Sequence, residues 1–234
     1  MQSAISNLNH YEIPTDCGSD SQNDNSVIGT NGVSVYFKDL ENRLIAHILE
    51  ADAVFGAVAW MTHAEILEAM ASIPNSSIII QKEDFLRPDV GVRSNFKTFL
   101  SEKYSGLRNR ITRYDHHNLL RDMSMHGDPT IDPIRCVGNH NREKHPAFPR
   151  MHNKFLVFAK TEDTEEGYSI SPYAVWTGSF NFTKNATLSM ENALYITQKD
   201  IVDAYYHEYG QIAAISEPIN WESDWMAPEW RIGT

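Results

Sequence analysis

The chain has 234 residues, 41% of them hydrophobic, so it can bury one substantial core, and we expect one domain with at most a small appendage. The first thirty residues contain neither a long apolar run nor a basic leader, and no later stretch reaches the length of a membrane span. These features argue against a secreted or membrane-embedded protein. They predict a soluble, cytoplasmic one in which Cys17 and Cys136 are free thiols rather than a disulfide.

The net charge of -11 argues against a nucleic-acid partner for the chain as a whole, but the charge is distributed unevenly. Residues 82–160 carry 15 Lys and Arg against 9 Asp and Glu, a balance of +6, whereas the rest carries 5 against 22, a balance of -17. The basic segment is either a surface that attracts phosphate groups or an ordinary solvated face, and the count alone leaves both open.

The first half of the chain alternates strand and helix patterns. Residues 1–31 are polar and predict a flexible N-terminal arm that orders against a partner, before a folded domain over 32–218 and a C-terminal tail over 219–234. Apolar runs predict strands at 33–37, 53–60 and 76–81, and helical spacing predicts one helical face through Leu40, Leu44, Ile45, Ile48 and Leu49. Further helices are expected after Thr62, in capping-box spacing with Glu65, and over 90–107, ended by Gly106. The alternation predicts an α/β fold with a mixed or parallel sheet and helices on both faces.

The second half begins with an irregular stretch over 114–149, broken by a short strand "IRCV" at 134–137. The run "MHNKFLVF" (151–158) predicts a buried strand, followed by an acidic connector, "AKTEDTEEGYSISP" (159–172). A strand containing "YAVWTGSFNF", a third strand within "ENALYIT" and an amphipathic helix over 200–215 complete the expected elements.

Polar pairs interrupt the apolar strands of this half. Residues i and i+2 of a strand share a face, so His152 and Lys154 project side by side, and Ser179 and Asn181 repeat this arrangement on the next strand. Glu191 stands at the entrance to the third strand. Placing an ammonium beside an imidazole is costly unless an anion lies between them, and a phosphate would meet that need.

The motifs "HNK", "GSFNFT" and "MEN" together resemble the phospholipase D superfamily, whose signature is H-x-K-x4-D, then G-S-x-N and a Glu near the next strand. The similarity is closest to the small single-motif members, which include bacterial endonucleases and mitochondrial cardiolipin-hydrolase-like proteins. The resemblance implies a phospholipase D-like mixed β-sheet flanked by helices on both faces, with one motif per chain. It also implies that 32–218 is a catalytic domain and that two motifs meet across a homodimer.

One position departs from this signature, because the family's aspartate falls on Ala159. In the family that residue is understood to support the hairpin rather than to contact substrate. Its absence therefore puts the hairpin geometry in question more than the chemistry. A longer, acidic connector is one way in which the aspartate could become dispensable.

The residue types suit the cleavage of a phosphodiester, which needs a nucleophile, an acid for the leaving oxygen, and groups that hold the phosphoryl oxygens. We expect His152 of one subunit to form a phosphohistidine and His152 of the partner subunit to act as the acid. Lys154 and Asn181 would hold the oxygens, Ser179 would donate a further hydrogen bond, and Glu191 would accept from the other ring nitrogen of His152. This scheme uses no metal and no other cofactor.

A metal site is the competing interpretation of the histidine-rich stretch. His116, His117 and His126 lie in the irregular segment, and Cys136, His140 and His145 form C-x3-H-x4-H, a spacing that matches no strong zinc pattern. We expect loop histidines here rather than ligands. Arg142, Lys144 and Arg150 are expected to contact the substrate's phosphate backbone.

Three functions remain open at this stage. The basic segment and the single motif favour a nuclease, with DNA preferred over RNA as the substrate. A phospholipid phosphodiesterase of the cardiolipin type is the alternative, although no amphipathic helix for holding a bilayer is evident. A catalytically silent module for dimerisation or partner binding is the third, and the N-terminal arm is a possible docking segment for a protein partner.

Overall fold

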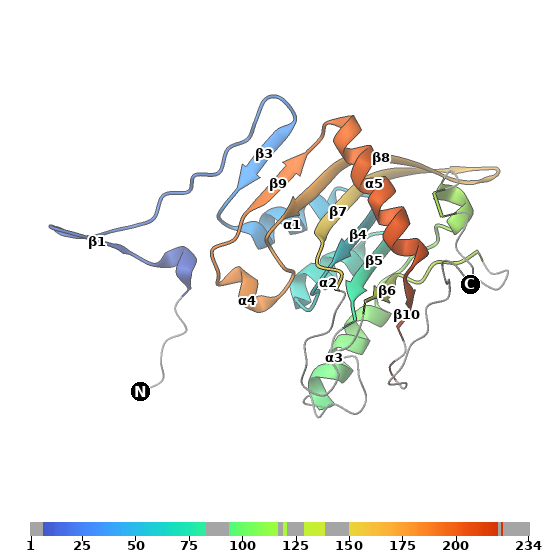
Figure 1. Ribbon diagram of the computed structural model, residues 1–234, viewed down its shortest axis with the longest axis horizontal. Helices are drawn as coiled ribbons and strands as arrows, with labels where there is room; N and C mark the ends of the chain where they lie inside the picture. Colours follow the sequence, from blue (N-terminus) through green and yellow to red (C-terminus); the bar gives the residue numbers. More distant parts are fainter. Residues whose placement is uncertain are drawn as a thin grey trace.

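The computed structural model describes residues 7–82, 94–116, 119–120, 129–138, 150–219 and 221. Its centre is a mixed sheet, crossed in front by one long helix and backed by shorter helices (Figure 1). Within the described residues the sheet has eight strands, in the spatial order β10 (Glu217–Pro218), β6 (Ile134–Val137), β5 (Asn75–Gln81), β4 (Ala53–Val58), β7 (Lys154–Thr164), β8 (Gly167–Gly178), β9 (Ala193–Ile196) and β3 (Val33–Tyr36).

The sheet changes character at β4. On one side β4, β5 and β6 run parallel, and β10 closes that edge antiparallel to β6. On the other side β7, β8, β9 and β3 follow as antiparallel neighbours. All six residues of β4 are buried, as a central strand with both faces covered requires, and its sequence is accordingly apolar throughout.

Helices cover both faces of the sheet, which confirms the predicted fold class. The helices α1 (Leu40–Leu49), α2 (Ala64–Ser72) and α3 (Ser94–Ser105) pack into one hydrophobic cluster with Val54 and Val58 of β4. The alternate residues Phe55 and Ala57 belong to a second cluster, on the face covered by α5 (Lys199–Ala214). The two-residue alternation of a strand thus divides the core into two layers.

Two local predictions need correction. The helix α2 begins at Ala64 with His63 as its N-cap and no side-chain cap bond, so Thr62 is not the cap. The reason is that the backbone N–H groups of Thr62 and His63 both donate to the carbonyl of Phe182, which holds this stretch extended. Leu49 is 55% exposed, because the buried stripe of α1 runs through Leu40, Leu44 and Ile48 instead. The expected helix over 90–107 is α3, whose described part ends just before Gly106; its first expected residues lie outside the described ones.

The expected acidic connector over 159–172 is wrong, since these residues form the outer half of a long hairpin between β7 and β8. A tight turn at Glu165 and Glu166 joins the strands, and Gly167 follows it with a φ of 128°, which favours glycine. The Asp115 carboxylate accepts the N–H of Tyr168 at 2.8 Å, tying the hairpin to the 3-10 helix η3 (Arg113–His116). The polar composition predicted a loop, but an exposed hairpin is also rich in polar residues, because both of its faces meet solvent.

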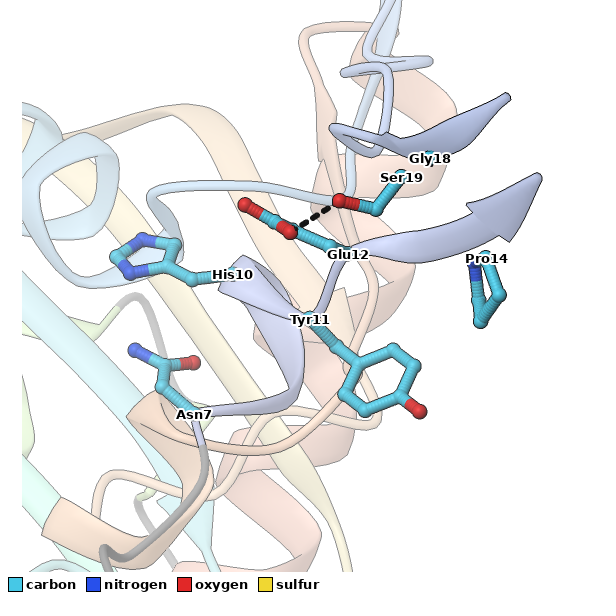
Figure 2. Close-up of a pocket in the computed structure, with 7 residues that line it drawn as sticks. All are labelled: Asn7, His10, Tyr11, Glu12, Pro14, Gly18 and Ser19. Carbon is cyan, nitrogen blue, oxygen red and sulfur yellow. Dashed lines mark hydrogen bonds between the residues drawn. The ribbon is translucent and has the colours of Figure 1, made fainter. Parts of the chain in front are cut away.

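Residues 7–31, expected to be an arm without a fold of its own, contain a short 3-10 helix η1 (Leu8–His10) and a hairpin of β1 (Ile13–Thr15) and β2 (Gly18–Asp20). The hairpin projects away from the sheet, and all its residues are exposed (Figure 1). A hollow of about 470 Å³ lies between η1 and the hairpin, where the Ser19 hydroxyl donates to Glu12 (Figure 2).

The arm is attached to the body near the short helix α4 (Lys184–Thr187). The N–H of Leu8 donates to the carbonyl of Leu188 at 3.0 Å, and the Asn9 amide donates to the carbonyls of Thr187 and Ser189. These bonds place the base of the arm beside the chain segment that follows the "GSFNFT" motif.

Both cysteines are free thiols, as predicted, with Cys17 exposed and Cys136 buried. Among the described helices, none has the length and apolarity that crossing a membrane would take.

Candidate active site

The motifs of the sequence gather at one end of the central strands, where β4 ends and β7 begins. The strand β7 starts at Lys154 and not at Met151, so His152 lies just before the strand rather than within it. This corrects the predicted strand over 151–158. Val58, the last residue of β4, is the register partner of Lys154.

Buried backbone contacts fix the segment that carries His152. The N–H of Met151 donates to the side-chain oxygen of Gln81 at 2.7 Å, and the N–H of Ala59 donates to the carbonyl of Asn153 at 2.9 Å. Gln81 is 1% exposed, so the first of these bonds is shielded from water. His152 is therefore held on both sides, although it stands outside the regular strand.

The His152 and Lys154 side chains lie together, as predicted. The Lys154 Nζ is 3.3 Å from Nδ1 of His152 and 3.5 Å from Nε2, and it also donates to the His152 carbonyl at 3.1 Å. His152 is exposed and Lys154 half-buried, so the pair is open to a substrate. An ammonium and an imidazole at this separation would suit an anion, as the sequence predicts for this pair.

The "GSFNFT" segment turns away from β8 beside this pair. Phe180 and Phe182 are buried in the core, while Ser179 is exposed and Asn181 half-buried, which is the alternation that the sequence predicts. The predicted strand is wrong for these residues, because β8 ends at Gly178. The N–H of Phe182 donates to the carbonyl of Trp60 at 3.0 Å, so the segment runs along the continuation of β4. The two motifs are thus brought to the same end of the sheet by β4.

A steric constraint explains why the motif has a glycine at position 178. A Cβ at Gly178 would lie 2.2 Å from the carbonyl oxygen of Asn192, which is closer than any side chain permits. That same oxygen accepts the N–H of Ser179 at 3.1 Å. A larger residue at Gly178 would push apart β8 and the segment that carries Glu191.

Glu191 and Ser179 are joined directly. The Ser179 hydroxyl donates to the Glu191 carboxylate and accepts the N–H of Asn192 at 3.1 Å. Ser179 therefore orients Glu191. Its single hydroxyl hydrogen is used in this bond, so the hydrogen bond to the phosphate expected from Ser179 stays a prediction that requires the hydroxyl to turn away from Glu191. The expected hydrogen bond from the His152 ring to Glu191 stays a prediction.

Trp60 is a residue that the sequence analysis did not single out. Its ring meets the His152 ring edge-on, with centroids 5.5 Å apart at 84°, and its centroid is 6.0 Å from Lys154 Nζ. It also lines a pocket of about 410 Å³ together with Asn181 and Glu191. Trp60 connects the two motifs, and its position just beyond the carboxyl end of a fully buried strand was the available signal.

Burial lowers the pKa of the Lys154 ammonium, because the charged form is poorly solvated there, and the negative charge of Glu191 raises it in opposition. A phosphate bound between these groups would supply further negative charge and favour the ammonium. The site is therefore best protonated when it is occupied by an anion.

This balance predicts a pH effect. If Lys154 must be protonated for substrate capture, Glu191→Gln removes the charge that raises its pKa, and the alkaline limb of kcat/KM should move to lower pH. Rates of phosphodiester cleavage measured across neutral to alkaline pH test this, with the exposed Glu208→Gln on α5 as the matched control. An alkaline limb that stays in place or moves upward would contradict the assigned coupling.

The remaining candidates lie partly outside the described residues. Arg150 is exposed and immediately precedes Met151 at the site, whereas Arg142 and Lys144 fall in a range that the structure leaves out. His140 and His145 also lie outside the described residues. Burial raises the pKa of the Cys136 thiol to about 12. Within the described ranges, no three His, Cys, Asp or Glu side chains are grouped as metal ligands.

Ala159, at the position of the family's aspartate, is fully buried in β7 next to an irregularity in the pairing with β8. Its carbonyl accepts the N–H of Asp52, whose carboxylate accepts the N–H of Thr161 at 3.1 Å and lies 3.4 Å from Lys160 Nζ. The hairpin forms without an aspartate at 159, and a carboxylate from the residue before β4 binds it instead.

Several known proteins are similar to this chain. Residues 97–212 match the family described as cardiolipin synthase, PLD-like domain. An uncharacterized protein of Acanthamoeba polyphaga mimivirus is 31% identical over 216 residues, covering 87% of this chain and 72% of the relative. Among solved structures, NucT from Helicobacter pylori has a TM-score of 0.47 at 16% identity, covering 80% of this chain and 98% of that one. Nuc from Salmonella typhimurium, a phospholipase D family member, has a TM-score of 0.44 at 16% identity, covering 77% and 93%.

The structure thus has a mixed sheet covered by helices on both faces, with an imidazole, an ammonium and a G-S-x-N segment at one end. The chain belongs to the phospholipase D-like family.

Proposed function

We propose that the protein is a metal-independent endonuclease that cleaves DNA, or RNA, through a phosphohistidine intermediate at a site shared by two copies of the chain. The contact between Lys154 Nζ and the His152 ring, exposed at the end of the sheet, carries this proposal. It places a nucleophile beside a cation that can hold a phosphoryl oxygen.

In the first step a ring nitrogen of His152 bonds to phosphorus and the bond from phosphorus to the leaving oxygen breaks. His152 of the partner subunit, protonated, gives its proton to that oxygen. In the second step the now neutral imidazole of the partner removes a proton from water, the water oxygen bonds to phosphorus, and the phosphorus–nitrogen bond breaks. Lys154 and Asn181 hold the non-bridging oxygens through both steps.

The resemblance implies that the second histidine comes from another copy of the chain, and the structure describes five histidines besides His152. His47 is half-buried beside Glu50, and His63 is buried beside Glu41. The His116 ring is buried and hydrogen-bonded to the Tyr206 hydroxyl. His10 stands on the arm and His207 on α5. A homodimer would supply the acid by symmetry.

Two further expectations belong to this proposal. The exposed hairpin of the arm is a two-stranded element of marginal stability on its own, which suits docking against a protein partner. The free thiols at Cys17 and Cys136 suit a cytoplasmic location.

The direct test is incubation of the purified protein with labelled single- and double-stranded DNA, RNA and cardiolipin vesicles, with and without EDTA. We expect nucleic acid to be cut at an unchanged rate in EDTA, because Lys154 and the two imidazoles supply the positive charge. A strict requirement for a divalent metal would overturn the mechanism. Cleavage of cardiolipin alone would replace the nuclease with a phospholipid phosphodiesterase, and cleavage of neither would leave a silent module.

A second test concerns substrate binding by Arg142, Lys144 and Arg150. Replacing all three with Gln should weaken DNA binding and flatten its dependence on salt, because a phosphate that the protein no longer neutralises keeps its counterion. The slope of log K against log salt should shrink in magnitude by about 2 to 3. Fluorescence anisotropy of labelled DNA at several salt concentrations measures it. Replacing Lys160, Lys199 and Lys103, of which the first two are exposed and the third half-buried, is the matched control, since all three lie away from the site. An equal slope in wild type and triple variant would show that the substrate path lies elsewhere.

A further inference from the structure

The pocket beside the catalytic pair has a distinct composition. It holds about 410 Å³, within the range of small-molecule sites, and is lined by Trp60, Thr62, Asn181, Thr183, Asn185 and Glu191 among others. One large aromatic ring is accompanied by amides, hydroxyls and a carboxylate. Within the described part, the only other apolar side chain at its wall is that of Ala186, and the remaining lining residues are polar.

The pocket is continuous with the site of phosphoryl transfer through three of its members. Trp60 contacts the His152 ring and lies 6.0 Å from Lys154 Nζ, while Asn181 and Glu191 are site residues as well as pocket residues. A group bound there would belong to the part of the substrate next to a phosphate held by His152 and Lys154. The neighbour of a phosphate in a nucleic acid is a nucleoside.

The lining also matches what a nucleobase offers. A base presents a flat π-face, for which an indole is a good stacking partner, and an edge of hydrogen-bond donors and acceptors. Amide side chains such as Asn181 and Asn185 can both donate and accept, and the hydroxyls of Thr62 and Thr183 can do the same. The Asn181 side-chain oxygen has no hydrogen-bond partner among the described residues although it is buried.

We propose that this pocket binds one unpaired nucleobase next to the scissile phosphate, with Trp60 as its stacking platform, and that the substrate is therefore single-stranded nucleic acid. This inference rests on the proposed nuclease function and adds the substrate class. In a duplex the base is stacked on both sides and paired along its edge, so it would have to be flipped out before it could enter. Trp60 is a binding residue in this scheme.

The experiment compares two single strands of equal charge, a 12-mer of oligothymidylate and a 12-mer of tetrahydrofuran abasic units. Wild type should have a kcat/KM for oligothymidylate about 10- to 100-fold higher, since stacking of one base is worth about that factor. In Trp60→Ala the preference should fall to about 3-fold or less, and Trp60→Phe, which keeps an aromatic face, should restore most of it. Anisotropy measurements with wild-type protein give the same ratio for binding.

Each outcome decides. Equal kcat/KM values of wild type for the two strands, or an undiminished preference in Trp60→Ala, would overturn the base pocket while leaving the nuclease intact. If wild type cuts neither strand and no RNA, the nuclease proposal fails, and the binding ratio still tests the pocket. Tighter binding of a paired dT12·dA12 duplex than of the single strand would overturn the single-strand assignment. Displacement of oligothymidylate by cardiolipin vesicles but not by mononucleotides would assign the pocket to a lipid headgroup.

Discussion

His152→Asn is expected to lower the turnover number on nucleic acid by about 10⁴-fold or more, because it removes the nucleophile from one subunit and the acid from the other. Asparagine keeps a polar side chain at an exposed position, and the segment is held through Met151 and Asn153, so the fold should be unchanged. Affinity for substrate should stay close to that of wild type, since Lys154 and Asn181 remain. Single-turnover cleavage and anisotropy together separate the two effects.

The matched control is His207→Asn, because His207 is an exposed histidine on α5 whose ring contacts the carbonyl of Asp203. It should behave as wild type in both measurements. Cleavage by His152→Asn at rates near wild type would remove the catalytic role from this residue. A drop in affinity as large as the drop in turnover would point to a structural role instead.

A heterodimer of one wild-type and one His152→Asn chain is expected to retain only a few per cent of wild-type activity, since the single shared site then lacks either its nucleophile or its acid. If each chain worked alone, such a heterodimer would keep about half of the activity. Chains carrying two different affinity tags allow the heterodimer to be purified. Its rate is then compared with that of a doubly tagged wild-type dimer.

Two further measurements make this comparison decisive. A heterodimer with His207→Asn should be fully active, which excludes an effect of the tags. Activity per chain should also fall on dilution below the dissociation constant of the dimer. A monomer that sediments as such and stays fully active would show that one chain holds a complete site.

The sequence predicts the apolar framework of this protein well, because burial on both faces leaves a direct mark. The run at β4 and the alternation of Phe180 and Phe182 with Ser179 and Asn181 are visible without coordinates. The outer hairpin is not, because polar residues in an exposed ribbon and in a loop have the same composition. Its regularity depends on Asp52 and Asp115, which are distant in the sequence.

The candidate site also has one feature that the sequence predicts and one that it does not. The proximity of His152 and Lys154 follows from their spacing, although the strand begins later than the pattern indicates. Trp60 reaches the site because β4 lies next to β7 and because the Trp60 carbonyl, just beyond the end of β4, accepts the N–H of Phe182. Strand order is a tertiary property, so a residue that reaches the site through it has no motif of its own in the sequence.

The most direct measurement of the central claim is the identification of the covalent intermediate. Wild-type protein is mixed with an excess of single-stranded oligonucleotide, quenched within milliseconds in alkaline denaturant, which preserves a phosphorus–nitrogen bond, and examined by peptide mass spectrometry. We expect a nucleotide adduct on His152, formed and consumed at rates compatible with turnover and absent from His152→Asn. An active protein that forms no adduct, or that forms one on another residue, would contradict the mechanism proposed for this site.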